Sequence, residues 1–145
     1  MDIEHLGARL REALENAKAA AEVSESVFRH GAVLFRRAKI HGAGCNQYRA
    51  VKWAWPSSYK RDQSHAESEI RLNNMHAEVA SMHNVKREKI LGSDVFVVRL
   101  NKQGELRNSR PCKNCQKAMS RKGVRRCYFS IDESTVGVLN IIKGR

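Results

Sequence analysis

Two short segments of this 145-residue chain contain side chains that bind metal ions readily. Residues 76–78 have the sequence His-Ala-Glu, and residues 111–115 have the sequence Pro-Cys-Lys-Asn-Cys. One imidazole and two thiolates suit zinc in catalytic sites, where a fourth position stays open for water. A Cys-x-x-Cys at the start of a helix places both sulfur atoms on one side of the ion, and the helix dipole favours the thiolate form. The chain must therefore fold so that two helix starts meet at zinc held by His76, Cys112 and Cys115.

The position of Glu78 indicates a reaction rather than a structural metal site. Glu78 lies two residues beyond His76, close enough to approach the metal without being a ligand. A carboxylate there can accept a proton from a water that zinc has acidified and then pass it on. A purely structural zinc site, the alternative, has no need of this residue. A second His-Ala-Glu occurs at 65–67; we favour 76–78 because a compact helix, a Gly-Ser break and a strand follow it.

Hydrophobic periodicity predicts alternating helices and strands along the chain. The predicted helices are 2–28, 74–89 and 112–121, and the predicted strands are 31–38, 39–46, 94–101, 126–131 and 136–142. The apolar run at 94–101 predicts a strand buried on both faces. Only residues 132–135 separate the last two strands, too few for a parallel crossover, so an antiparallel hairpin is predicted. The sequence therefore predicts an α/β layer fold with a mixed sheet, in a single domain over residues 1–145.

Three smaller features refine this prediction. Glycines at 42 and 44 indicate either a β-bulge or a close backbone approach in the second strand. Cys45 and Cys127 lie in apolar stretches and are predicted to be buried thiols. Residues 47–64 predict a long, basic and aromatic loop of the kind that often serves a function.

The charge distribution indicates an anionic partner. The net charge is +12, and the stretches 29–61 and 107–126 each contain eight Lys or Arg and no acidic residue. Such a field attracts a polyanion or a phosphorylated substrate, although a merely solubilising surface is the alternative. Within the loop, Trp53 and Trp55 could stack on unpaired bases while Arg49 and Lys52 follow phosphates. The two tryptophans could instead contact the core or a neighbouring subunit.

The N-terminal segment and the overall hydropathy exclude two classes of protein. No apolar run approaches the ~18 residues that a membrane span needs. The first 25 residues are charged throughout and lack the apolar core of a signal peptide. We therefore expect an intracellular, cytoplasmic protein with no membrane partner. The amphipathic first helix either covers the sheet of its own domain or meets another copy in a homo-oligomer.

On these residues the chain resembles the cytidine deaminase-like superfamily. His-x-Glu followed by Pro-Cys-x-x-Cys is the pattern of zinc-dependent deaminases. The resemblance extends from about Gly31 to Ile142 and includes the segments GAVLFRRAKIHGAGCN, MHAEVA, VFVVRL, SRPCKNC and RRCYFSID. It implies a three-layer fold with a five-stranded mixed sheet flanked by helices. It also implies a zinc cofactor on His76, Cys112 and Cys115, with Glu78 moving protons.

The resemblance implies substrate contacts as well. Asn46 is expected to contact the sugar, and backbone groups at Ala77 and around Ser109 and Arg110 are expected to hold the edge of the base. The Arg110 side chain could instead bind a mononucleotide phosphate.

Three functions remain open at this point. The first is deamination of cytosine in a nucleoside or nucleotide. The second is deamination of cytosine, less readily adenine, in single-stranded DNA or RNA. The third is a nucleic-acid-binding module with a structural zinc. The terminal hairpin is similar to that of free-nucleoside enzymes, whereas the histidine ligand and the basic charge favour larger or phosphorylated substrates.

Overall fold

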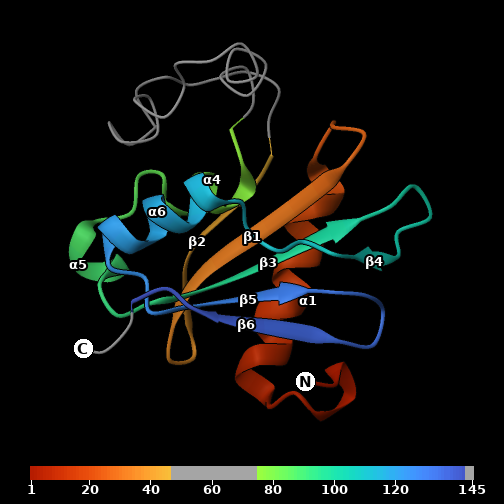
Figure 1. The fold of residues 1–145 in the computed structure, drawn as a ribbon, viewed down its shortest axis with the longest axis horizontal. Helices are drawn as coiled ribbons and strands as arrows, with labels where there is room; N and C mark the ends of the chain where they lie inside the picture. The colour runs from red at the N-terminus through yellow and green to blue at the C-terminus, as the bar shows by residue number, and fades with distance from the viewer. Residues whose placement is uncertain (47–74, 143–145) are drawn as a thin grey trace.

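The computed structural model describes residues 1–46 and 75–142. Labels follow Figure 1. The helical elements are η1 (Ile3–His5), α1 (Ala8–Val23), α4 (Ala77–Met82), α5 (Arg87–Ile90) and α6 (Lys113–Lys122). The strands are β1 (Arg29–Arg36), β2 (Lys39–Cys45), β3 (Asp94–Leu100), β4 (Leu106–Arg107), β5 (Arg126–Ser130) and β6 (Val136–Asn140).

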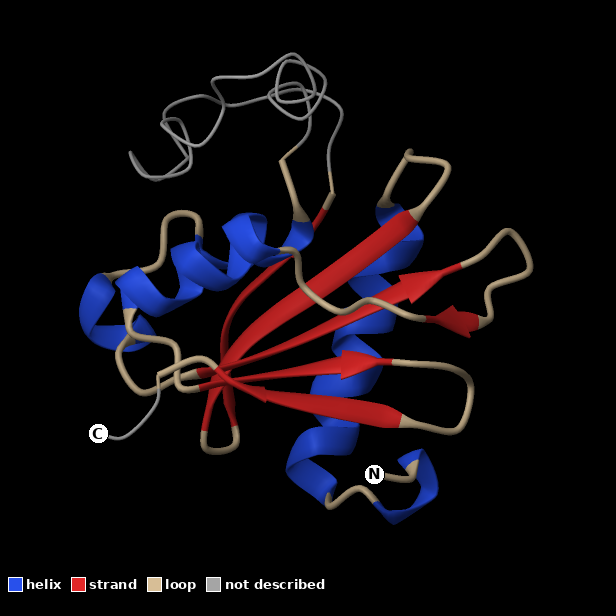
Figure 2. Ribbon diagram, viewed as in Figure 1, coloured by secondary structure: helices blue, strands red, loops and turns tan. Residues whose placement is uncertain are grey.

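The strands form one open mixed sheet in the order β2-β1-β3-β5-β6 (Figure 2). The pair β3–β5 is parallel, whereas β1–β2, β1–β3 and β5–β6 are antiparallel. The predicted terminal hairpin is confirmed, with Ser130 opposite Val136 at its turn. The predicted sheet had five strands, and the structure adds a sixth because the two-residue strand β4 pairs with the end of β3.

Helices cover both faces of the sheet, which makes three layers (Figure 1). On one face α1 buries Ala13, Leu14, Ala17 and Ala21. On the other face α4 and α6 form a second core around Met75 and Met119. The three-layer fold with a mixed sheet is therefore confirmed.

Strand β3 supplies both cores, as its apolar sequence predicts. Val95 and Val97 contact the core under α4 and α6, and Phe96 and Val98 contact the core under α1. Successive side chains of a strand point to opposite faces, so only an uninterrupted apolar run fits a strand covered on both sides.

Glycines bring α4 very close to β2. A Cβ atom built on Gly44 would lie 2.5 Å from the Cβ of Ala80, and one built on Gly42 would lie 2.1 Å from the carbonyl oxygen of Ser81. The register between β1 and β2 also shifts between Leu34 and Phe35. Both structures that the glycines predicted, a β-bulge and a close backbone approach, are therefore present. The close approach of β2 to α4 positions α4.

Two predicted helices differ from the observed ones. The helix predicted over 2–28 is η1 followed by α1. The chain leaves the helix at Ser24, and Phe28 lies beyond it and is 60% exposed. The helix predicted over 74–89 is divided into α4 and α5: the chain leaves α4 at His83, which is extended, and Asn84 follows in a left-handed conformation with φ 63°. Cys127 is buried as predicted, whereas Cys45 is partly exposed.

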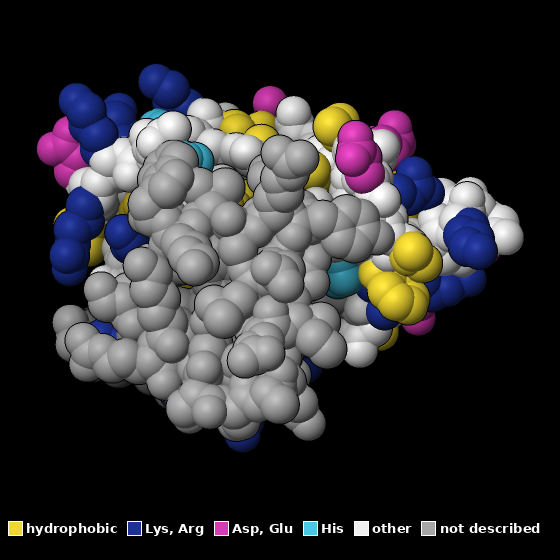
Figure 3. Space-filling view, turned by 90° about the horizontal axis from the view of Figure 1, so that it is seen from above, with side chains coloured by type: hydrophobic (Ala, Val, Ile, Leu, Met, Phe, Trp, Pro, Cys, Tyr) yellow, Lys and Arg dark blue, Asp and Glu magenta, His cyan; other side chains and the backbone are white. Residues whose placement is uncertain are grey.

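Two properties of the surface bear on partners. Among the described residues, no helix is long and apolar enough to cross a membrane. Lys and Arg side chains gather at opposite sides of the face that Figure 3 shows from above.

Candidate metal centre and cavity

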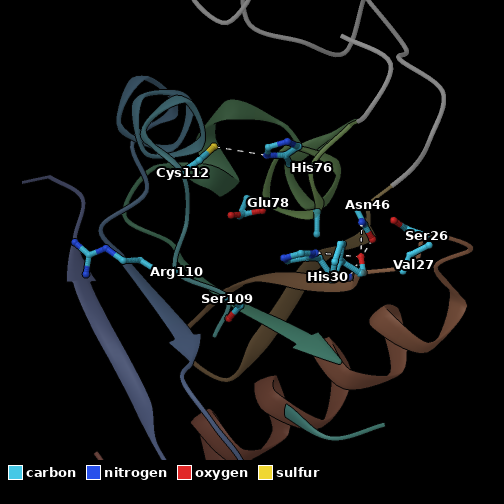
Figure 4. Close-up of a pocket in the computed structure, with 11 residues that line it drawn as sticks. Ser26, Val27, His30, Asn46, His76, Glu78, Ser109, Arg110 and Cys112 are labelled. Carbon is cyan, nitrogen blue, oxygen red and sulfur yellow. Dashed lines mark hydrogen bonds between the residues drawn. The ribbon is translucent and has the colours of Figure 1, made fainter. Parts of the chain in front are cut away.

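The two predicted segments meet. The Nδ1 atom of His76 lies 3.2 Å from the Sγ of Cys115 and 3.6 Å from the Sγ of Cys112. The three ligand atoms lie within 4.8 Å of one another. Figure 4 shows His76 and Cys112 facing each other across the start of their helices. One nitrogen and two sulfur donors at this spacing fit a tetrahedral zinc with one open position.

Local backbone structure holds the two cysteines. Cys112 is the residue before α6, and its sulfur accepts a hydrogen bond from the backbone N–H of Cys115 at 3.5 Å. A hydrogen bond from the Cys115 thiol is the main reason that the pKa of Cys112 falls to about 4. The same interaction and complete burial raise the pKa of Cys115 well above its usual range. Cys112 is therefore prepared as a thiolate before a cation arrives.

Glu78 is a buried carboxyl group beside this cluster. It belongs to the first turn of α4, and the residue is only 5% exposed. Burial raises its pKa above the usual range, while the neighbouring His76 opposes this shift. We call the side chains of His76, Cys112 and Cys115 the metal cluster. Figure 4 shows the Glu78 carboxylate pointing into the space between these side chains and the sheet. A carboxyl group there can exchange protons with a molecule in that space.

That space is a cavity of about 400 Å³. Residues from α4 and the start of α6 form one wall, the segment before β1 forms another, and the turn before α6 closes a third. The lining residues are Ser26, Val27, Phe28, His30, Asn46, His76, Ala77, Glu78, Ser109, Arg110 and Cys112. The cavity has room for a nucleobase with its sugar beside the metal cluster.

Asn46 lines the cavity, but much of its side chain is engaged within the protein. Its amide oxygen accepts from the hydroxyl of Ser24 at 2.6 Å and from the backbone N–H of His30 at 3.0 Å. Its amide nitrogen donates to the carbonyl of Phe28 at 2.7 Å. The expected sugar contact of Asn46 therefore rests on one remaining amide hydrogen, while the residue fixes the segment before β1.

Ser109 and Arg110 line the edge of the cavity. The Ser109 hydroxyl points away from the cavity and contacts the carbonyl of Val97 at 2.9 Å and the hydroxyl of Ser130 at 2.9 Å. The backbone N–H of Ser109 donates to Ser130, and that of Arg110 donates to Asn108. The Arg110 guanidinium lies 5.8 Å from the centre of the Phe129 ring and extends away from the cavity (Figure 4).

Sequence reasoning missed His30. Its ring lines the cavity from β1, on the side opposite the metal cluster (Figure 4). The signal was available in the alternation of β1: His30 shares a strand face with Ala32 and Leu34, which belong to the core under α4 and α6. His30 continues the strand face of Ala32 and Leu34 beyond the buried core, and a polar side chain at such a position can line a cavity.

Several predicted residues lie outside the described part of the chain. These are Arg49, Lys52, Trp53 and Trp55 of the basic loop, together with the second His-Ala-Glu at 65–67. Their predicted roles remain predictions.

Residues 5–131 match the family model described as the cytidine and deoxycytidylate deaminase zinc-binding region. No curated protein matches the chain.

Solved structures share the fold at low sequence identity. The dCMP deaminase of cyanophage S-TIM5 in apo form is 19% identical with a TM-score of 0.52, and 86% of this chain and 84% of that chain are covered. The same enzyme in complex with dCMP and dUMP is 21% identical with a TM-score of 0.51, over 86% and 83% of the chains. Cytidine deaminase from Burkholderia pseudomallei is 20% identical with a TM-score of 0.56, over 90% and 91%.

Proposed function

Because the chain belongs to the cytidine and deoxycytidylate deaminase family, we propose that it deaminates cytosine to uracil in a nucleoside or nucleotide. One observation carries this proposal. A buried carboxyl group, Glu78, shares a cavity with a cluster of one imidazole and two thiols that suits zinc. Hydrolytic deamination needs an activated water and a group that moves protons, and these residues supply both functions.

The chemistry divides between the cation and the chain. Bound zinc would supply Lewis-acid activation of a water molecule. Glu78 accepts a proton from the attacking water and donates one to the ring nitrogen N3 of cytosine. The carbon–oxygen bond forms at C4. Glu78 then takes the second proton from the new hydroxyl group and delivers it to the amino nitrogen, and the bond from C4 to that nitrogen breaks to release ammonia. His76 and Cys112 line the same wall of the cavity as Glu78.

Backbone groups at the edge of the cavity favour a substrate base that has an amino group. The N–H groups of Ser109 and Arg110 have partners within the protein, so a backbone contact from this turn to the base would come from a carbonyl group. A carbonyl accepts from the amino group of cytosine. Ala77 begins α4, so its N–H has no acceptor within the helix and can donate to the base carbonyl.

Deamination within single-stranded nucleic acid is the second candidate. The net charge of +12 favours it. The structural likeness to a dCMP deaminase that has been crystallised with dCMP and dUMP favours the mononucleotide instead. The cavity of about 400 Å³ has room for one nucleoside, so we place the nucleoside or nucleotide first.

A paired assay tests the proposal. Zinc-loaded protein is given cytidine, deoxycytidine, dCMP and a cytosine-containing single-stranded oligonucleotide, and released ammonia and uracil products are measured. We expect turnover of at least one monomer. Turnover of the oligonucleotide alone would reject the proposal in favour of the second candidate, and no turnover of any substrate by protein that contains zinc would reject both.

A further inference from the structure

His30 brings an imidazole ring into the cavity from the side opposite the metal cluster. Its backbone is fixed twice: the strand pairs it with Arg99 of β3, and its N–H donates to the amide oxygen of Asn46. Figure 4 shows the side chain directed from β1 into the space below Glu78. The ring is therefore held at a defined place in the site, yet neither the metal cluster nor the proton transfers require it.

Hydrogen bonding determines which ring nitrogen faces the cavity as an acceptor. The Nδ1 atom lies 3.3 Å from the carbonyl oxygen of Phe28. A carbonyl only accepts, so Nδ1 carries the hydrogen and Nε2 carries the lone pair in the neutral ring. Among the described residues, no hydrogen-bond partner of Nε2 is found.

The surroundings keep the ring neutral. The pKa of His30 is lowered to about 4, chiefly by burial; the nearby His76 and Arg99 also lower it, whereas Phe28 and Cys112 oppose the shift. At neutral pH the cavity therefore presents an uncharged acceptor at Nε2. Such an atom requires a hydrogen-bond donor from the substrate.

A cytosine nucleoside or nucleotide offers few donors. Its amino group is the group that leaves, and it must lie beside Glu78 and the metal cluster. The remaining donors are sugar hydroxyls, and the one that deoxycytidine and dCMP share is the 3′-hydroxyl. Asn46 cannot accept from it readily, because both acceptor positions of its amide oxygen are occupied by Ser24 and His30.

We propose that His30 is a specificity-determining residue whose Nε2 atom accepts a hydrogen bond from the 3′-hydroxyl of the substrate sugar. Asn46 and Ser24 act as positioning residues that hold the His30 backbone and the segment before it. The proposal rests on the proposed function, since it takes the cytosine nucleoside or nucleotide as the substrate. It predicts that the site distinguishes sugars that differ only at the 3′ position.

Substrate and residue are varied together to test this. Deoxycytidine is compared with 2′,3′-dideoxycytidine, which lacks the 3′-hydroxyl, on the unaltered protein and on His30→Leu and His30→Gln. An unpaired buried polar group costs enough that the unaltered protein should prefer deoxycytidine by about tenfold or more in kcat/KM. His30→Leu should lose that preference by slowing deoxycytidine alone, and His30→Gln, which keeps an acceptor, should restore part of it. His41→Leu on β2, outside the cavity, is the matched control and should keep the preference.

The results separate the two proposals. Equal loss on both substrates in His30→Leu, or a preference that survives in it, overturns the role of His30 while leaving deamination established. Nitrogen NMR of histidine-labelled protein provides a readout without turnover. We expect the Nδ1–H tautomer, and a shift of the Nε2 resonance when deoxycytidine, but not dideoxycytidine, is added to Glu78→Gln. A hydrogen found on Nε2 overturns the inference even if no substrate is deaminated, an outcome that separately rejects the proposed function.

Discussion

At the scale of single residues, the proposed chemistry depends on the charge state and reach of one buried carboxyl group. Glu78→Gln keeps the size and the hydrogen-bonding outline of the side chain but cannot accept or release a proton. We expect zinc binding to be retained and kcat to fall by about 100- to 10,000-fold, the usual contribution of a general acid–base. Metal analysis and a deamination assay on the same preparation check both halves of this prediction.

The second His-Ala-Glu provides an internal control. Glu67→Gln makes the same chemical change in the same triplet sequence, and we expect little effect on turnover. If Glu67→Gln abolished deamination while Glu78→Gln remained active, the choice of His76 and Glu78 would be wrong.

The metal ligands make a separate prediction at this scale. Cys112→Ser and Cys115→Ser each replace a thiolate that zinc prefers by a hydroxyl that remains protonated, so we expect the bound metal to be lost. Cys45→Ser is the matched control, because Cys45 is a partly exposed thiol outside the cluster. Zinc content after dialysis, together with circular dichroism to check folding, measures the effect. Full zinc occupancy in Cys115→Ser would contradict the ligand assignment.

At the scale of elements, the site depends on how closely α4 lies against β2. A Cβ atom on Gly44 would meet the Cβ of Ala80 at 2.5 Å and its carbonyl carbon at 2.7 Å, so α4 would have to move. We expect Gly44→Ala to destabilise the protein by about 1–3 kcal/mol, as overpacking does, and to weaken zinc binding through the displaced His76. Gly7→Ala is the control, since nothing lies within 4 Å of a Cβ at that position.

Urea unfolding and zinc affinity measure this effect. Gly44→Ala with unchanged stability and zinc affinity would show that α4 tolerates displacement, and the glycine would then have no role in positioning the metal cluster.

Elements differ in how far the sequence predicts them. The strand β3 and the β5–β6 hairpin follow from local patterns, because an apolar run and a short connection each allow few structures. The break between α4 and α5 could not be predicted, since His83 is extended and Asn84 is left-handed within an otherwise helical hydrophobic pattern. Residue type and spacing predicted that His76, Cys112 and Cys115 would lie together, and the structure brings them together. The alternation of β1 places His30 on the face that carries Ala32 and Leu34, but the cavity that the ring lines forms only when β1 pairs with β3.

At the scale of the whole molecule, the net charge of +12 acts on charged partners and leaves neutral ones unaffected. Each phosphate that Lys or Arg neutralises releases counterions, so raising salt from about 50 to about 200 mM should weaken oligonucleotide binding at least about tenfold. Neutral deoxycytidine has no phosphate, so its binding releases no counterions. We therefore expect its kcat/KM to change by less than about twofold over the same range of salt. Fluorescence anisotropy with a single-stranded oligonucleotide and the nucleoside assay measure the two quantities. Oligonucleotide affinity that did not depend on salt would show that the basic side chains at the sides of the molecule (Figure 3) do not contact phosphates. A salt-dependent nucleoside reaction would instead indicate that ionic strength alters the site itself.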